Sequence, residues 1–307
     1  MLVILTGPTA VGKTALSISL AKELKGEIIS ADSCQVYQQL NIGSAKIRPE
    51  EMEGVPHHLI DAYPPDEPFH VFAFQQEAKR LIREIEGRGH TPMIVGGTGF
   101  YIQSVLYDID FSKEVDHSYR KELEEQALTE EGRHALWLKL QQVDPDYCAE
   151  CHENNSKRII RALEFYKQNG YPISRHNEEQ REKTSPYDFR YYVLTMDRGK
   201  LYERIDRRVD QMMEEGLLKE VEHLKEMGYS RDLLSMQALG YKQIYAYLDG
   251  ECTLEEAVDA IKENTRHFAK RQLTWFRREK DVIWLDKDAF ASEEAILQFI
   301  LEDLKKI

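Results

Sequence analysis

A glycine-rich segment near the N-terminus has the composition and spacing of a loop that binds phosphate groups. It reads Gly7-Pro8-Thr9-Ala10-Val11-Gly12-Lys13-Thr14, in which two glycines flank four residues and are followed by lysine and threonine. Such glycines let backbone amides point at one anion, Lys13 can reach a phosphate oxygen, and the Thr14 hydroxyl can bind Mg²⁺. A polyphosphate site is therefore predicted. The loop alone does not show that the polyphosphate is ATP or that a phosphoryl group moves.

Two further polar residues follow segments that read as strands. Asp32 comes after the apolar run at 27–30, and Thr98 follows two glycines after the run at 93–95. The carboxyl ends of parallel strands line one edge of a sheet, so both residues are expected beside the phosphate loop. Asp32 could accept a proton or help to hold the metal, and Thr98 could donate to a phosphate or bridging oxygen. The alternatives are a turn or cap at Asp32 and a glycine turn capped by Thr98.

A basic stretch near the C-terminus reverses the sign of an otherwise acidic chain. The 307 residues include 54 Asp and Glu against 41 Lys and Arg, a formal net charge of -13. Residues 261–280 are predicted to form one helix, and their only acids are Glu263 and Glu279. Its basic residues recur at helical spacing: Lys262, Arg266, Lys270 and Arg277, with His267, Arg271 and Arg278 alongside. This pattern is typical of a surface for a phosphate backbone, and the alternative is a charged face on an ordinary core helix.

The elements that must position these residues alternate between strand and helix. Apolar runs at 2–5, 27–30 and 93–95 are predicted strands, and periodic segments at 15–24, 72–86 and 99–106 are predicted helices. This rhythm predicts an α/β fold, a P-loop core with a parallel sheet and helices on both faces.

The sequence pattern changes after about residue 112, where no further strand-like runs occur until residue 191. Helices are predicted at 119–140 and 155–168, and a strand at 191–195 returns the chain to the core. Further helices at 201–227, 252–279 and 293–305 and a strand at 282–285 follow. The predicted domains are 1–111 as the first part of the core, 112–190 as a mostly helical insertion, and 191–307 as the C-terminal part with the basic helix.

Composition excludes several classes of protein. Hydrophobic residues make up 42% of the chain, which excludes wholesale disorder, and no apolar run is long enough to span a bilayer. Four cysteines are too few to stabilise a chain of this size through disulfide bonds, so a reduced, cytoplasmic protein is expected. Cys148, Cys151 and His152 resemble half of a zinc site, but no second pair has a usable spacing, and structural cysteines are the preferred interpretation.

An ordered series of motifs resembles a known family, the tRNA dimethylallyltransferases or tRNA isopentenyltransferases. The resemblance covers nearly the whole chain, and the series is far more specific than the phosphate loop alone. It comprises residues 7–14, Asp32-Ser33-Cys34-Gln35-Val36-Tyr37, Asn41 to Lys46, Pro56 to Asp61, Gly96 to Thr98, Lys157 to Glu164, Arg204 to Arg208, Gln237 to Lys242, and Lys270 to Phe276.

The resemblance implies transfer of a dimethylallyl group from dimethylallyl diphosphate to the exocyclic amine of the tRNA adenosine just 3′ of the anticodon. It implies a bacterial-type enzyme without the zinc finger of eukaryotic members, acting with Mg²⁺ and expected to be a monomer. By correspondence, Gly7 to Thr14 hold the diphosphate, Asp32 is the general base, Thr98 lies near the leaving oxygen, and Arg208 contacts the diphosphate. The implied tRNA contacts are Asp32, Ser33, Cys34, Gln35, Lys157, Arg158, Arg161, Gln237, Gly240, Tyr241, Lys242, Lys270, Arg271, Gln272, Trp275 and Arg277.

The residues suit this chemistry. The adenine amine is a poor nucleophile, so the reaction needs a leaving group whose growing negative charge is stabilised by loop amides, Lys13, Mg²⁺ on Thr14 and Arg208. The alkylated nitrogen is acidic, and an ordinary carboxylate such as Asp32 can take its proton. On the residues alone, Arg204 and Arg208 read as a solvated helix face, and the resemblance singles out Arg208. The side chain that stacks on the swung-out adenine has three candidates, Tyr37, Tyr241 and Trp275.

Three other functions share parts of the pattern. A small-molecule kinase has the same loop and would phosphorylate a metabolite with ATP while leaving tRNA inert. An adenylate isopentenyltransferase would modify a free nucleotide, but the helical insertion and the basic helix favour a macromolecular acceptor. A nucleotide-gated binding module has no need of Asp32 and Thr98 beside an intact loop.

Overall fold

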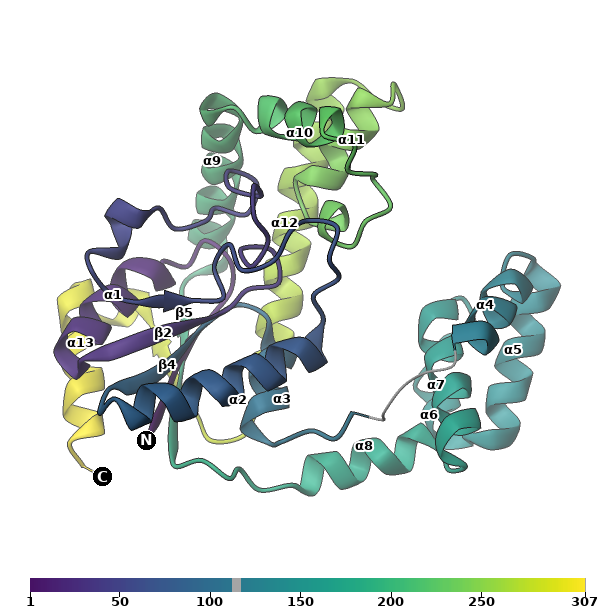
Figure 1. Cartoon of the computed structure of the whole chain (residues 1–307), viewed down its shortest axis with the longest axis horizontal. Coiled ribbons are helices and arrows are strands. Elements are labelled where there is room, and N and C mark those ends of the chain that lie inside the picture. The colour runs from purple at the N-terminus through teal and green to yellow at the C-terminus, as the bar shows by residue number, and fades with distance from the viewer. Residues whose placement is uncertain (112–116, 307) are drawn as a thin grey trace. The chain divides into compact units, whose positions relative to one another are not determined.

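A parallel β-sheet forms the centre of the larger part of the chain (Figure 1). The computed structural model describes residues 1–111 and 117–306. The six strands lie in the order β3-β2-β4-β1-β5-β6. Their bounds are β1 Leu2–Thr6, β2 Gly26–Ala31, β3 His57–His58, β4 Thr91–Gly96, β5 Phe189–Thr195 and β6 Val282–Asp286. The predicted strands are confirmed, and the short edge strand β3 was not predicted.

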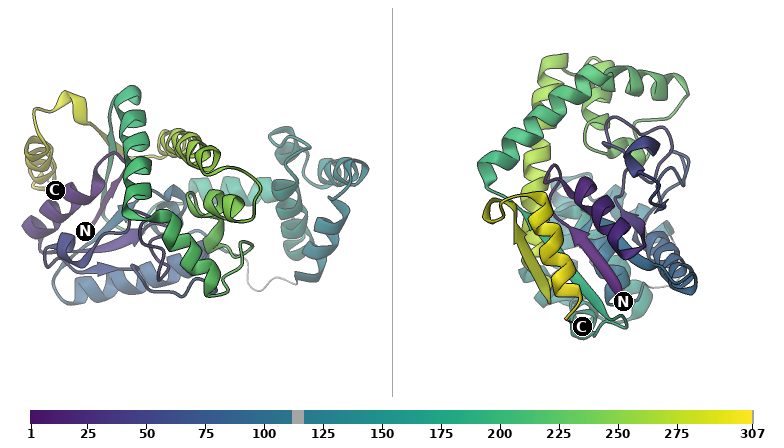
Figure 2. Two further views of the ribbon diagram at one scale, coloured as in Figure 1. Left: turned by 90° about the horizontal axis from the view of Figure 1, so that it is seen from above. Right: turned by 90° about the vertical axis from the view of Figure 1, so that its left-hand side faces the viewer.

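Helices cover both faces of this sheet, which confirms the predicted fold class (Figures 1 and 2). On one face α1 (Lys13–Leu24) packs against α13 (Glu293–Leu304), in a core that includes Val3 and Leu5 of β1. Side chains alternate between faces along a strand, so the buried Ile4 points to the other face. Helix α2 (Val71–Gly87) packs against β2 and β4 and against α3 (Gly99–Leu106). Both helices were predicted from their apolar periodicity.

Four helices lie between β5 and β6 within the same unit. They are α9 (Arg198–Glu215), α10 (Leu217–Glu226), α11 (Tyr241–Leu248) and α12 (Leu254–Phe276), and α12 packs against both α9 and α11. The prediction of one continuous helix over 201–227 was wrong. Gly216 has φ of +106°, a left-handed conformation that ends α9 and lets α10 start in a new direction. Short 3-10 turns complete the unit at Pro49–Met52, Ser235–Gln237 and Lys287–Ala289.

Contacts divide the chain into two compact units, one of residues 1–106 and 187–307 and one of residues 107–186. The described helices of the second unit are α4 (His117–Gln126), α5 (Glu130–Val143), α6 (Pro145–Ala149), α7 (Ser156–Asn169) and α8 (Ile173–Glu182). A single helix over 119–140 was predicted, but the Thr129 hydroxyl accepts from Gly132 N and starts α5 as a separate helix. The predicted domain boundary at 111/112 falls at residues 112–116, which lie outside the described residues.

The second unit has an apolar core of its own. Leu136 and Leu140 of α5 pack there with Ile160 and Leu163 of α7. Cys148 and Cys151 are buried in this core as free thiols, and Cys148 Sγ lies 3.7 Å from the Trp137 carbonyl oxygen. Burial raises the pKa of both thiols. The two cysteines therefore act as small apolar core residues.

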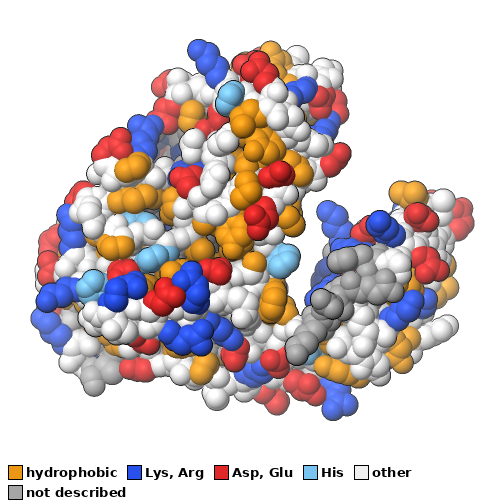
Figure 3. Space-filling model, in the orientation of Figure 1, with side chains coloured by type: hydrophobic (Ala, Val, Ile, Leu, Met, Phe, Trp, Pro, Cys, Tyr) orange, Lys and Arg blue, Asp and Glu red, His pale blue; other side chains and the backbone are white. Residues whose placement is uncertain are grey.

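The surface of the larger unit carries charges of both signs. On the face drawn in Figure 3, acidic and basic side chains alternate over α2, where Arg80 pairs with Glu77 and Glu84 at 2.7 Å each. Within residues 1–111 and 117–306, none of the helices combines the length and the apolar character that crossing a bilayer requires.

Candidate active site

The phosphate loop joins β1 to α1 with the conformation that anion binding requires. Gly7, Ala10 and Gly12 have φ of +149°, +63° and +99°. A side chain at Gly7 is excluded, because a Cβ there would lie 2.6 Å from the carbonyl oxygen of Leu194. Helix α1 begins at Lys13, so its unpaired N-terminal amides belong to this loop. The positive end of the helix and the curled backbone together form an anion site.

Three cationic side chains lie at the phosphate loop, one from the loop itself and two from distant parts of the sequence. Lys13 Nζ donates to the carbonyl oxygens of Gly7 and Pro8 at 2.9 Å each. Arg204 Nε donates to the Ala10 carbonyl oxygen at 2.8 Å, so this exposed side chain also braces the loop. Lys287 Nζ would lie 2.9 Å from a Cβ on Gly12. Three cationic side chains therefore lie at the loop, and one of them, Lys287, also pairs with the Glu293 carboxylate.

Gln272 connects the phosphate loop to the turn after β4. Its Oε1 accepts from Thr9 N at 2.9 Å, and its Nε2 donates to the Gly97 carbonyl oxygen at 2.9 Å. The side chain is buried, and a Cβ on Gly97 would lie 2.3 Å from Nε2. Both ends of the Gln272 amide therefore hold two loops together. The contact between Gln272 and tRNA stays a prediction.

Lys13, Asp32 and Arg208 form one electrostatic cluster at the carboxyl ends of β1 and β2. Burial lowers the pKa of Lys13 to about 8, with Asp32 opposing the shift and Arg208 adding to it. The pKa of Arg208 is likewise lowered, mainly by burial and then by Arg204, while Asp32 opposes it. The resemblance had selected Arg208, and the structure brings it together with the loop lysine and the carboxylate.

Asp32 forms the turn that was offered as the alternative, and its part as a proton acceptor stays a prediction. Its Oδ1 accepts from the amides of Cys34 and Gln35 at 2.9 and 3.3 Å, which is the turn geometry. The side chain is only half-buried, and it lies close enough to Lys13 and Arg208 to affect the pKa of each. The turn therefore fixes the direction of a carboxylate that faces two cations. Nearby, burial raises the pKa of Cys34 to about 12, so that thiol is not a nucleophile.

Thr98 lies at the same edge of the sheet. Its amide donates to the Ala31 carbonyl oxygen at 3.1 Å, and α3 begins at the next residue. The turn needs glycine before it, because a Cβ on Gly96 would lie 2.2 Å from the same carbonyl oxygen. Thr98 is thereby held next to the residue that precedes Asp32, as the order of strands predicted.

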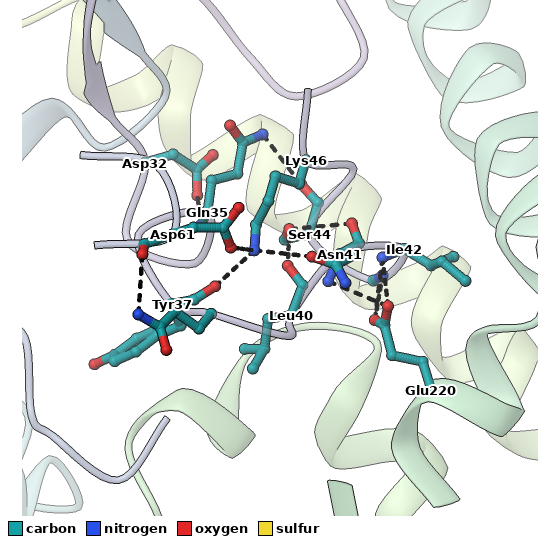
Figure 4. A network of polar contacts seen from close by, with 12 residues as sticks. Asp32, Gln35, Tyr37, Leu40, Asn41, Ile42, Ser44, Lys46, Asp61 and Glu220 are labelled. Atoms are coloured by element: carbon teal, nitrogen blue, oxygen red, sulfur yellow. Dashed lines mark hydrogen bonds and ion pairs between the residues drawn. The ribbon is translucent and has the colours of Figure 1, made fainter. Parts of the chain in front are cut away.

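A polar network continues from Asp32 into the segment 35–46 (Figure 4). Gln35 Nε2 donates to the carbonyl oxygens of Ser44 and Ala45 at 3.2 and 3.1 Å. The Lys46 ammonium is almost fully buried and contacts the Tyr37 carbonyl oxygen at 2.7 Å and the Asp61 carboxylate. Sequence reasoning assigned no part to Lys46 or to Glu220, which closes the network from α10. Glu220 bonds to Ile42 across 178 positions, which no local spacing signals. The partners of Lys46 lie within 15 positions, but in loops that have no periodic pattern.

The basic helix α12 divides into a paired half and an exposed half. Lys262 and Arg266 form ion pairs with Asp210 and Asp206 of α9 at 2.5 Å each, so the alternative of an ordinary charged face holds for these two. Lys270, Arg271 and Arg277 are exposed. Trp275 is partly buried against Gly99, and its ring meets that of Phe100 edge-on at 5.9 Å.

The predicted contacts at 237–242 also divide by exposure. Gln237 and Lys242 are exposed, whereas Gly240 and Tyr241 are buried. The Tyr241 hydroxyl donates to Glu220 Oε1 at 2.6 Å, so it is a positioning residue and not a stacking surface. Tyr37, another stacking candidate, is buried with its hydroxyl accepting from Phe69 N at 2.9 Å. Of the three candidates, Trp275 keeps the most accessible ring.

In the second unit, α7 exposes the predicted tRNA contacts. Lys157, Arg158 and Arg161 are all exposed on this helix. Arg158 Nε donates to the Tyr147 hydroxyl at 3.2 Å with its guanidinium over the ring, and Arg161 lies 3.7 Å from the buried Glu164. These contacts orient the cations without burying them.

Thr14 is the residue on which a metal ion was predicted. It is exposed in the first turn of α1, where its hydroxyl can reach a ligand in the loop. The described part of the chain holds no group of three or more His, Cys, Asp and Glu suited to a metal. This donor set fits Mg²⁺, which commonly takes one or two protein oxygens and most of its ligands from phosphate and water.

Comparisons with known proteins show which family the chain resembles. Residues 35–279 match the model of a family described as IPP transferase. The tRNA dimethylallyltransferase of Lachnoclostridium phytofermentans is 62% identical over 297 residues, 96% of this chain and 95% of that protein. That of Carboxydothermus hydrogenoformans is 50% identical, covering 98% and 96%.

Solved structures show the same likeness. The tRNA isopentenylpyrophosphate transferase of Bacillus halodurans superposes with a TM-score of 0.74 at 48% identity, covering 99% of this chain and 97% of the other. A eukaryotic dimethylallyltransferase acting on tRNA gives a TM-score of 0.79 at 30% identity, covering 98% and 79%. The chain therefore belongs to the IPP transferase family.

Proposed function

We propose that the protein transfers a dimethylallyl group from dimethylallyl diphosphate to the exocyclic amine of the tRNA adenosine 3′-adjacent to the anticodon, releasing diphosphate. Relatives at 62% and 50% identity bear the name tRNA dimethylallyltransferase, which supports the reaction class. The single observation that carries the proposal is the cluster of Lys13 and Arg208 with Asp32. Two cations suit a departing diphosphate, and the carboxylate opposite them suits proton removal.

The loop is suited to binding the leaving group. Diphosphate departs with growing negative charge, and the N-terminal amides of α1, Lys13 and Arg208 stabilise that charge. Lys13 now donates to loop carbonyls and would turn to the phosphate oxygens. Mg²⁺ held by Thr14, when bound, would neutralise further charge on the diphosphate.

Asp32 is the group that accepts the proton. Once the amine has attacked the allylic carbon, its nitrogen carries positive charge and is strongly acidic, so a carboxylate with ordinary basicity is sufficient. The turn that holds Oδ1 keeps the carboxylate oriented before the base arrives. Thr98, at the same edge, is placed to donate to the leaving oxygen.

Exposed basic residues support tRNA as the acceptor. Lys270 and Arg271 on α12 and Arg277 just after it are exposed and can meet phosphates, and α7 offers Lys157 and Arg158 in the second unit. We place the reaction in the cytoplasm, in keeping with the free thiols. One chain supplies the loop, the base and the basic helix, so we propose that a monomer is active.

Nucleoside analysis of modified tRNA tests the proposal. Pure protein, Mg²⁺, dimethylallyl diphosphate and tRNA should yield adenosine heavier by one five-carbon unit, located by ribonuclease mapping beside the anticodon. A parallel reaction with free AMP should be much slower than one with an anticodon stem-loop. Unmodified tRNA together with phosphorylation of a small metabolite by ATP would overturn the proposal, and equal rates on AMP and the stem-loop would overturn the tRNA acceptor.

A further inference from the structure

The carboxylate of Glu220 is held by a curl of backbone amides. It accepts from the amides of Asn41, Ile42 and Gly43 at 3.2, 2.8 and 3.2 Å, in the turn that follows Leu40 (Figure 4). Successive amides that converge on one anion form a strong, charge-assisted site. Glu220 belongs to α10, so this contact joins a helix of the C-terminal part to a loop of the N-terminal part.

The same carboxylate is fixed from its other side by α11. The Tyr241 hydroxyl donates to Glu220 Oε1 at 2.6 Å, and the Tyr241 side chain is fully buried. Gly43 packs directly on that ring, because a Cβ at Gly43 would lie 2.6 Å from Tyr241 Cε2. Glu220, Tyr241 and the turn at 41–43 are therefore one packed and hydrogen-bonded unit.

From this turn a continuous series of contacts leads to Asp32. The side-chain Nε2 of Gln35 donates to the carbonyl oxygens of Ser44 and Ala45 at 3.2 and 3.1 Å. The backbone amide of Gln35 donates to Asp32 Oδ1 at 3.3 Å. Lys46 secures the far end of the segment through the Asn41 side-chain oxygen at 3.0 Å and through Asp61. The position of Gln35 thus depends on the 41–46 segment, and that segment depends on Glu220.

We propose that Glu220 is a positioning residue that couples the start of α11, through Tyr241, to the Asp32 loop. It acts through the 41–46 turn and Gln35, and it keeps the general base aligned with the acceptor adenine. This inference rests on the proposed function and adds to it a residue that touches neither substrate. The hydrogen bonds described above run from Glu220 to Gln35 and Asp32, so their loss should spare the diphosphate loop.

Hydrogen exchange tests the coupling without reference to the reaction. Glu220→Gln keeps the side-chain volume but replaces one accepting oxygen by an NH₂ group. That group cannot accept from the amides of the 41–43 turn or from the Tyr241 hydroxyl. We expect faster amide exchange at 41–43 and also at 34–35, with the phosphate loop unchanged. Glu226→Gln, an exposed acid on the same helix, is the matched control and should alter neither segment. Faster exchange confined to 41–43 would overturn the coupling.

Single-turnover kinetics test whether this coupling affects the rate of transfer. Under single turnover at a temperature where both proteins are fully folded, Glu220→Gln should lower the transfer rate to an anticodon stem-loop by about tenfold, while donor affinity stays within about twofold. Gln35→Ala should cause a similar loss, and the double variant should be no worse than Gln35→Ala alone, since both act on one path. A lower unfolding midpoint with an unchanged rate would reduce Glu220 to a structural residue. An inactive wild-type protein would contradict the proposed function, and hydrogen exchange would still decide the coupling.

Discussion

At the scale of single residues, Asp32 combines a structural contact with the expected chemistry. Its Oδ1 caps the turn at 34–35, so replacing it with alanine would disturb the loop as well as remove the base. Asp32→Asn retains an oxygen for those amides and loses only basicity. We predict that it lowers the single-turnover rate by about 10²-fold or more, with donor binding and thermal stability near those of the wild type. Rapid-quench assays with labelled donor measure this, and a near-normal rate would identify another base.

Arg204 gives a second prediction at this scale. Its hydrogen bond to the Ala10 carbonyl oxygen braces a loop residue in the left-handed region, and Arg204→Met would leave that oxygen without its partner. We expect donor affinity to weaken by about tenfold, as measured by calorimetry. Arg207→Met is the control, because Arg207 is exposed and donates only within its own helix. Equal effects in the two variants would show that the loop does not depend on this brace.

Local patterns predicted which residues would meet a ligand, and they gave no sign of the residues that hold those in place. Lys13 and Asp32 stand in short motifs beside strands, so their spacing revealed them. Gln272 bonds to Thr9 across 263 positions, and Glu220 bonds to Ile42 across 178 positions. No periodicity in one sequence connects residues so far apart. The burial of Gln272 and Tyr241 was hidden for the same reason, and both were predicted as tRNA contacts.

At the scale of elements, α12 should bind the tRNA backbone through its exposed half. We predict that Lys270→Ala with Arg271→Ala weakens stem-loop binding and flattens the plot of log affinity against log salt by about 1 to 2 units of slope. Lys305→Ala with Lys306→Ala removes the same charge from exposed lysines at the end of α13 and should leave the slope unchanged. Filter binding over a salt series measures both. Equal slopes for the two variants would place the tRNA elsewhere.

Another prediction concerns the opposite end of the sheet, where Glu27 of β2 joins three segments. The buried carboxylate accepts from Arg88 at 2.7 Å and meets His58 of β3 and His90 before β4 at 2.7 Å each. The hydrogen bond with Arg88, together with those from the histidines, lowers its pKa from 4.5 to about 2. A lowered carboxyl pKa stabilises the fold above the unfolded value and loses that effect as the pH falls.

Glu27→Gln should therefore be less stable than the wild type at pH 7, and the gap should shrink between about pH 4.5 and 2. Urea unfolding across that range measures the difference in unfolding free energy. A gap that stays constant down to the lowest pH would show that the ion cluster contributes nothing to folding.

Elements were predictable where their signals were local. Apolar runs located the longer strands, and periodicity located α2 and α7. Gly216 interrupts a pattern that stays amphipathic on both sides, so one helix was predicted where two exist. Thr129 hides a helix start within a charged stretch. Strand β3 has two residues and exists only because its backbone pairs with Ile28 and Ile29.

At the scale of the whole molecule, the chain uses a phosphate-binding architecture with a separate helical unit. Each of the two units has its own apolar core. The larger unit holds the loop, Asp32 and α12 together, so the proposed chemistry belongs to it alone. The central claim is that the loop holds diphosphate as a leaving group and does not deliver a phosphoryl group.

A donor labelled in two places tests that claim most directly. Dimethylallyl diphosphate would carry ¹⁴C in the allyl group and ³²P in the diphosphate, and the products with tRNA would be separated after complete reaction. We predict ¹⁴C in the tRNA and all ³²P in free diphosphate, because the carbon–oxygen bond breaks. Any ³²P transferred to the acceptor, or ¹⁴C remaining in a five-carbon alcohol phosphate while tRNA stays unlabelled, would contradict the account.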